Sequence, residues 1–169
     1  MRIFGLAGWS GSGKTTLMTA LIPELVSRGI TVSTIKHAHH SFDIDQPGKD
    51  SWLHRQAGAQ EVMVASGQRW ALMHELRGAT EPSFEELVRR MSPVDLLLVE
   101  GFKRYPHPKI EIYRPSLGKP LLHPEDRSVV AVASDEALPG LPLPWLPLSD
   151  AGAIADFILA HDVCERWLS

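Results

Sequence analysis

The sequence of 169 residues lacks several features that would point to particular classes of protein. It has a single cysteine, Cys164, which excludes a framework of internal disulfide bonds and fits a reducing compartment. It has no run of about 18 apolar residues, and the apolar segment after Met1 is too short for a signal peptide. We therefore expect no membrane-spanning helix and a cytoplasmic location. Lysine and arginine number 17 against 20 for aspartate and glutamate, so the chain also lacks the basic field of nucleic-acid-binding proteins.

Glycine, in contrast, is concentrated near the start of the chain, in a stretch that reads Gly8-Trp9-Ser10-Gly11-Ser12-Gly13-Lys14-Thr15-Thr16. An apolar run precedes it and a helical apolar pattern follows it, which is the context of a nucleotide phosphate loop. Its backbone N–H groups would converge on a phosphate at the positive end of the helix dipole. Lys14 would contact the β- and γ-phosphates and Thr15 would coordinate Mg²⁺, a role to which Thr16 is less suited. The alternative is a turn that only joins a strand to a helix.

Strands and helices alternate along most of the chain. Strands are expected at residues 3–7, 30–36, 61–66, 69–74, 94–100, 109–113 and 128–133, and helices at 14–28, 50–58, 83–91 and after the capping pair Ser149-Asp150. The short gap between the third and fourth strands predicts an antiparallel hairpin. The rest predicts an α/β fold of three layers, P-loop NTPase-like, with a mainly parallel sheet and helices on both faces, in one domain over residues 1–169. Ligands bind beyond the carboxyl ends of such strands, where the phosphate loop and residues 37–50, 100–104 and 134–135 would gather.

A glutamate, Glu100, follows the apolar run Leu96–Val99. Such a run is typical of a central parallel strand. Glu100 stands where phosphate-loop proteins carry a second carboxylate, although aspartate is commoner there. It could hold Mg²⁺ through a water or orient an attacking water, which makes Lys14 and Glu100 the candidate catalytic residues. The alternative is a structural ion pair of Glu100 with Lys36 or Lys103.

A basic and histidine-rich cluster follows the second expected strand, and it consists of Lys36, His37, His39 and His40, with Asp43 and Asp45 close behind. Three imidazoles and two carboxylates could ligate a transition metal, but the spacing matches no closed zinc pattern and a lysine opposes a cation. Lysine and histidine suit an anion, so we interpret the cluster as a second phosphate or pterin-phosphate site. A solvated polar loop is the alternative.

Asp135 follows the strand expected at 128–133, and its carboxylate could accept hydrogen bonds from N1–H and the 2-amino group of guanine. Adenine offers neither donor in that arrangement, so Asp135 would favour GTP over ATP. The asparagine and lysine of the guanine motif of GTPases are absent here. A carboxylate in a turn is the alternative.

Several blocks in this order resemble the MobB family of molybdopterin-guanine dinucleotide biosynthesis adaptors. They are the phosphate loop from Gly8 to Thr16, the histidine block from Lys36 to His40, residues 43–51, residues 68–73 and the stretch from Leu98 to Lys103. The resemblance spans about residues 3 to 160. Its histidine block and residues 47–51 are specific to the family, whereas the phosphate loop alone would fit many families. It implies a homodimeric GTP-binding protein with weak GTPase activity. Such a protein would assist the guanylyltransferase that joins GMP to molybdenum cofactor, whose organic part is molybdopterin.

Two other functions remain open at this point. An independent small-molecule kinase would use the same phosphate loop, but it would need a lid with several arginines to enclose the transferred phosphoryl group. The candidate lid segments, 75–83 and 114–127, carry only Arg77, Arg114 and Arg127. A metallochaperone-type NTPase would use the histidine block as a metal site. The sequence favours the adaptor.

Overall fold

The computed structural model describes residues 1–38, 42–102 and 105–161 and divides the chain into two compact units. The first unit comprises Met1–His37 and Arg89–Ser169, and the second comprises Ala38–Val88. The predictions that concern His39, His40, Lys103 and Cys164 fall outside the described residues.

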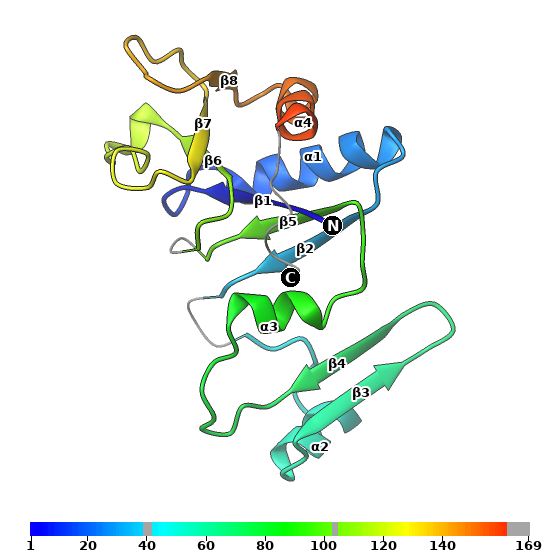
Figure 1. The fold of residues 1–169 in the computed structure, drawn as a ribbon. Helices are drawn as coiled ribbons and strands as arrows, with labels where there is room; N and C mark the ends of the chain where they lie inside the picture. Colours follow the sequence, from blue (N-terminus) through cyan, green and yellow to red (C-terminus); the bar gives the residue numbers. More distant parts are fainter. Residues whose placement is uncertain (39–41, 103–104, 162–169) are drawn as a thin grey trace. The chain divides into compact units, whose positions relative to one another are not determined.

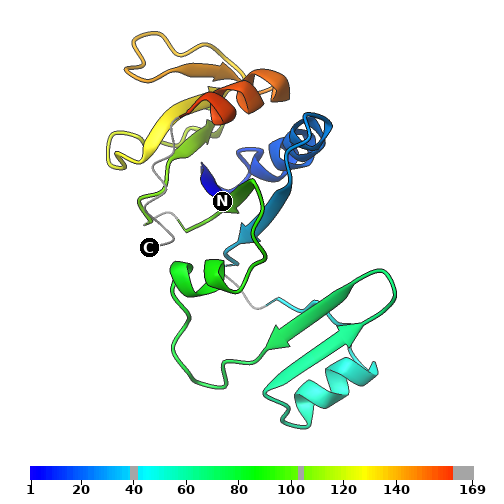
Figure 2. The same ribbon diagram turned by 45° about the vertical axis from the view of Figure 1, so that its right-hand side comes forward.

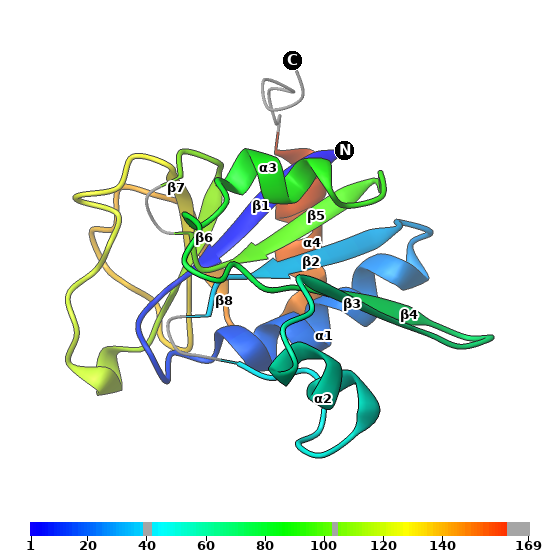
Figure 3. The same ribbon diagram turned by 90° about the horizontal axis from the view of Figure 1, so that it is seen from below.

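A six-stranded sheet forms the first unit, in the order β2-β5-β1-β6-β7-β8 (Figure 1). Its strands are β1 (Arg2–Ala7), β2 (Val32–Lys36), β5 (Leu96–Glu100), β6 (Lys109–Tyr113), β7 (Val129–Ser134) and β8 (Trp145–Pro147). Every neighbouring pair is parallel, and Figure 3 shows β2, β5 and β1 as arrows that point the same way. The predicted mainly parallel sheet is confirmed, and the proline-rich segment near its end contributes the edge strand β8.

Two helices, α1 (Lys14–Ser27) and α4 (Ala151–Ala160), pack on the same face of this sheet (Figure 1). Phe4 and Leu98 of the sheet, Leu21 of α1 and Ile154 of α4 belong to one fully buried core. Helix α1 ends just before Gly29, whose φ of +79° is the left-handed conformation expected of a helix C-terminus. Helix α4 begins with the predicted cap, because the Asp150 side chain accepts a hydrogen bond from the Ala153 N–H at 2.9 Å.

Strand β6 buries two charged side chains on the face opposite Ile110 and Ile112, since successive side chains of a strand alternate. The Lys109 ammonium donates to the Tyr105 carbonyl at 2.6 Å and to Asp126 at 3.0 Å. The Glu111 carboxylate accepts from backbone N–H groups of the segment that follows the strand, and burial raises its pKa. Polar loops anchored by these charges therefore cover this part of the sheet.

The second unit contains α2 (Asp50–Gln56), β3 (Glu61–Ala65) and β4 (Trp70–His74), and α3 (Phe84–Arg89) ends at its boundary. Strands β3 and β4 form the predicted antiparallel hairpin, with α2 beside it (Figure 2). The sequence Ser83-Phe84-Glu85-Glu86 predicts a capping box at the start of α3, and the structure confirms it. The Ser83 N–H donates to the Glu86 carboxylate at 2.7 Å, and the Glu86 N–H donates to the Ser83 hydroxyl at 3.2 Å.

Asp50 or Ser51 is the cap that the sequence predicts for α2, and this prediction is wrong. Lys49 occupies the N-cap without a side-chain hydrogen bond, and both Asp50 and Ser51 lie inside the first turn. The reason is the turn before the helix, in which the Lys49 N–H bonds to the Gln46 carbonyl at 3.1 Å and Gly48 takes a φ of +81°. The chain thus enters the helix one residue earlier, and Asp50 acts through the helix dipole instead of capping.

Arg55 on α2 connects the separate segments of the second unit. Its guanidinium pairs with Asp45 at 2.7 Å, Asp43 at 2.8 Å and Glu75 at 2.9 Å. The Arg55 hydrogen bonds lower the pKa of Asp45. The two carboxylates that follow the histidine block, Asp43 and Asp45, are therefore engaged in an ion-pair cluster that holds this unit together.

Candidate functional site

The phosphate loop between β1 and α1 requires glycine at three positions. Gly8, Gly11 and Gly13 have φ values of +151°, +79° and +101°, which residues with a side chain rarely adopt. A Cβ on Gly8 would also lie 2.5 Å from the Ile112 carbonyl oxygen and 2.6 Å from the Ser12 hydroxyl. The sequence therefore folds here into a tight loop whose backbone can approach a ligand closely.

Two side chains complete the loop. The Lys14 ammonium lies over it and donates to the carbonyls of Gly8 at 3.1 Å and Trp9 at 2.8 Å. Ser12 is buried, and its hydroxyl has no hydrogen-bond partner within the part of the chain that the structure describes. A buried polar atom of this kind is rare unless a ligand or water satisfies it. Thr15 and Thr16 follow in the first turn of α1.

Strand pairing brings Glu100 next to the phosphate-loop strand. Glu100 is in register with Leu6 of β1 on one side and with Lys36 of β2 on the other. The Glu100 carboxylate pairs with the Lys36 ammonium at 3.4 Å, so the ion pair considered as the alternative is present. The Glu100 side chain is 14% exposed and that of Lys36 is 60% exposed. Because the lysine is largely exposed to water, this contact is weak and leaves the carboxylate available to a second ligand.

The loops after β2 and β5 meet at the same edge. The His37 N–H bonds to the Glu100 carbonyl at 2.9 Å, and a Cβ on Gly101 would lie 2.9 Å from the His37 Cβ. The His37 ring contacts Phe102, with ring centroids 5.0 Å apart. Lys36 and His37 thus lie together at the carboxyl ends of β2 and β5, the edge at which the sequence predicts them.

Asp135 borders a hollow of about 260 Å³ beside the phosphate loop. The lining includes Gly13 and Thr16 from the loop and α1, Arg114 after β6, Asp135 after β7 and Ser149 after β8. The Asp135 carboxylate pairs with Arg114 at 3.0 Å. The hollow therefore joins the phosphate loop to the carboxyl ends of β7 and β8, within reach of one extended ligand.

Residues 114–127 contribute contacts to the phosphate loop that the sequence did not reveal. The Trp9 indole N–H donates to the Pro120 carbonyl at 2.8 Å, and the Lys119 ammonium lies 5.9 Å from the Trp9 ring centroid. Glu111 anchors the segment by accepting from the Leu122 and His123 N–H groups at 2.7 and 3.0 Å. Arg114 is the residue that could have pointed to this segment in the sequence. It is a cation directly after strand β6, and the neighbouring strand β1 leads into the phosphate loop.

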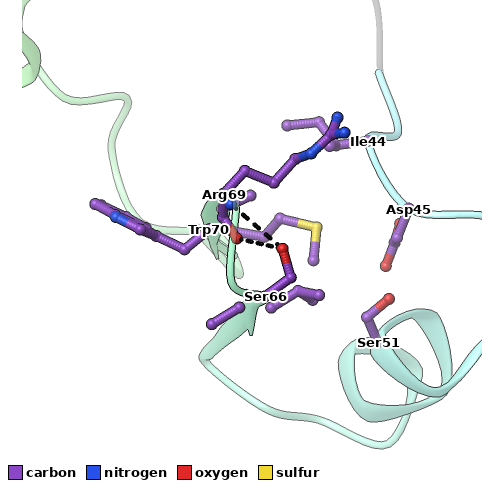
Figure 4. Close-up of a pocket in the computed structure, with 10 residues that line it drawn as sticks. Ile44, Asp45, Ser51, Ser66, Arg69 and Trp70 are labelled. Carbon is purple, nitrogen blue, oxygen red and sulfur yellow. Dashed lines mark hydrogen bonds between the residues drawn. The ribbon is translucent and has the colours of Figure 1, made fainter.

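A second hollow, of about 330 Å³, lies within the second unit between the hairpin and α2 (Figure 4). Its lining is mainly apolar and includes Ile44, Val64 and Trp70. Two of its polar side chains are used locally. The Ser66 hydroxyl bonds to Arg69 within the hairpin turn (Figure 4), and the Asp45 carboxylate pairs with Arg55. This hollow lacks the convergent polar groups of the first one.

Neither metal-binding clusters nor membrane spans emerge from the described residues. Among residues 1–38, 42–102 and 105–161, no three histidine, cysteine, aspartate or glutamate side chains are grouped to hold a metal ion. Over the same ranges, every helix is too short or too polar to cross a bilayer. His39 and His40, on which the metal alternative depends, lie outside these ranges.

Comparison with known proteins finds relatives that cover most of this chain. Residues 3–135 match the family model described as molybdopterin guanine dinucleotide synthesis protein B, MobB. An Escherichia coli K12 protein named molybdopterin-guanine dinucleotide biosynthesis adapter protein is 47% identical over 163 residues, covering 93% of this chain and 91% of that protein. A Haemophilus influenzae protein of the same name is 43% identical, with 98% and 89% covered.

Solved structures agree with these matches. A crystal structure of molybdopterin-guanine biosynthesis protein B superposes with a TM-score of 0.72 at 28% identity, covering 93% of this chain and 97% of the other. A MobB homologue from Bacillus stearothermophilus gives a TM-score of 0.67 at 25% identity, with 94% and 96% covered. The predicted fold class and the resemblance are both confirmed, and the chain belongs to the MobB family.

Proposed function

We propose that this protein binds GTP and Mg²⁺ at the phosphate loop and acts as an adaptor in molybdopterin-guanine dinucleotide biosynthesis, where it assists the guanylyltransferase. The observation that carries the nucleotide site is the loop from Gly8 to Thr15, with three glycines in the left-handed region and the Lys14 ammonium over the loop. The adaptor role rests on the names of the relatives from E. coli and H. influenzae. GTP hydrolysis would be slow and secondary.

The residues present fit a magnesium nucleotide. The buried Ser12 hydroxyl and the glycine backbone offer the loop's polar groups to phosphate, and Lys14 adds a positive charge. The Thr15 hydroxyl and, through a water, Glu100 would hold Mg²⁺, which neutralises phosphate charge when bound. The chain's own part is to orient the phosphates and keep the lysine beside them.

The hollow at Asp135 supports GTP as the nucleotide. It is continuous with Gly13 and Thr16, so a base could lie there while its phosphates occupy the loop. The Asp135 carboxylate would accept from N1–H and the 2-amino group of guanine. The half-exposed side chain, at 37%, leaves room for that contact.

Lys14→Ala tests the phosphate site. We expect the folded variant to lose GTP binding in titration calorimetry, because Lys14 faces the loop carbonyls and contributes charge to the site. Arg90→Ala is the matched control, since it removes one positive charge from an exposed position. Unchanged GTP affinity in folded Lys14→Ala would refute the site.

Asp135→Asn tests the base. The wild type should bind GTP more tightly than ATP, and the variant should narrow that difference by about 1.5–3 kcal/mol, the value of a hydrogen bond to a charged group. ATP affinity is the internal control and should not change. Equal affinities of the wild type for the two nucleotides would contradict the assignment.

Lys36 and His37 support a second anionic site, for the phosphate of molybdopterin beside the GTP. Both follow or end strands at the edge that carries the phosphate loop. His37→Ala should weaken molybdopterin binding and spare GTP binding. A metal site would instead lose occupancy on acidification, because protons compete with the metal for the ring nitrogens.

The hairpin of the second unit supports homodimer formation. Met63, Trp70 and Leu72 are large apolar side chains, 44% to 67% exposed, and the pairing register places them on one face of this two-stranded sheet. A second copy of the chain would cover them, because monomeric proteins rarely expose such a cluster. Sedimentation velocity of the wild type should give a dimer, and Trp70→Glu should shift it toward monomer. A monomeric wild type at micromolar concentration would rule the dimer out.

A further inference from the structure

Arg114 lies between the two parts of the nucleotide site. It follows β6, which stands between β1 and β7 in the sheet. The loop after β1 is the phosphate loop, and the loop after β7 begins at Asp135. The strand order therefore places the arginine between the group that binds phosphate and the group that would read the base.

One guanidinium bonds to both parts. Its Nε donates to the Ser12 carbonyl at 3.0 Å, and its Nη1 donates to the Asp135 carboxylate at 3.0 Å. It also borders Gly13, since a Cβ there would lie 3.4 Å from Nη2. The planar, rigid fork of an arginine fixes the spacing of two acceptors, and a lysine ammonium on a flexible stem does not.

We propose that Arg114 is a positioning residue that sets the base preference of the nucleotide site by holding Asp135 at a fixed distance from the phosphate loop. The inference rests on the proposed GTP site. The base and the phosphates of one nucleotide are joined through a ribose, so the carboxylate can meet the guanine edge only if it is correctly spaced from the loop.

The ion pair does not block Asp135. A carboxylate has about four acceptor positions on its two oxygens, and Arg114 occupies a position on Oδ2. The remaining positions can accept the two guanine donors while the guanidinium stays in place. Arg114 therefore supports recognition without leaving the site.

The test measures GTP, ATP and tripolyphosphate binding by calorimetry for the wild type, Arg114→Lys and Arg114→Met. Arg114→Lys keeps the charge and should bind tripolyphosphate as the wild type does, yet its GTP to ATP affinity ratio should fall roughly threefold to tenfold, as for residues in one coupled network. In Arg114→Met the ratio of GTP affinity to ATP affinity should fall equally, and this variant should also bind tripolyphosphate more weakly. Arg90→Met, at an exposed position, is the control and should change neither quantity.

A combined variant shows whether Arg114 acts through Asp135. In Arg114→Lys, adding Asp135→Asn should lower the ratio little further, because the two changes disrupt the same contact. An unchanged ratio in Arg114→Lys, or fully additive losses in the double variant, would overturn the inference while the GTP site stands. A wild type that does not prefer GTP would overturn both the proposed function and this inference.

Discussion

Acidification should destabilise this protein through His107, a histidine that the nucleotide site does not use. His107 is fully buried beside Gly5, whose added Cβ would lie 2.5 Å from the His107 Nε2. The pKa of His107 is lowered from 6.5 to about 4, chiefly by burial and also by the nearby Lys109 charge, with Asp126 opposing the shift. The folded protein thus holds a neutral imidazole over a range in which the unfolded chain would protonate it.

The sign and size follow from proton linkage. A depressed histidine pKa contributes stability that is fully present above pH 6.5 and is lost as the pH falls toward 4. Between pH 7.5 and pH 5 the two pKa values correspond to a loss of about 2 kcal/mol in the free energy of unfolding, because the unfolded state takes up a proton that the folded state excludes.

Urea unfolding at a series of pH values measures this loss. His107→Gln should have a lower free energy of unfolding than the wild type at pH 7.5. Because it lacks the histidine, its free energy of unfolding should fall less than that of the wild type between pH 7.5 and pH 5. His54→Gln, at an exposed position on α2, is the matched control and should follow the wild-type slope. Parallel curves for wild type and His107→Gln would refute the reasoning, as would an NMR titration of His107 with a midpoint above about 6.

Two further predictions concern packing and the ion-pair cluster. Gly5→Ala should lower the free energy of unfolding by about 1–3 kcal/mol, because its Cβ would overlap the His107 ring. Gly67→Ala, where a Cβ meets nothing within 4 Å, is its control in thermal melts, and equal stabilities would contradict the overlap. Arg55→Met should speed amide hydrogen exchange in α2 and leave α1 unchanged, since Arg55 pairs with Asp45 and Glu75 inside the second unit. Unaltered exchange in α2 would show that the cluster does not hold this unit.

The elements that were predicted well are those whose signals are local. The apolar run that forms β5 correctly predicts a central parallel strand, and the capping residues of α3 and α4 correctly predict where these helices begin. The strand began two residues later than expected, because Asp95 accepts hydrogen bonds from Thr31 instead of joining β5. The pairing of Asp95 with Thr31 was not visible in the sequence.

The features that escaped prediction depend on residues far apart in the chain. The alternation Lys109-Ile110-Glu111-Ile112 is typical of a strand with one face in water, yet both charges are buried under loops that end near Asp126. The division into two compact units has no counterpart in composition. Of the candidate site, the phosphate loop was recognisable from spacing, whereas the bonds from Arg114 to Ser12 and Asp135 arise only from strand order.

Trp9 gives the phosphate loop an optical reporter of its own. The indole belongs to the loop, bonds to the Pro120 carbonyl and has the Lys119 ammonium near its ring. Indole emission responds to the electric field of nearby charges, because the excited state redistributes electron density across the ring. A polyanion bound at Lys14 would alter that field directly, so the Trp9 share of the emission from the five tryptophans should change as the loop fills.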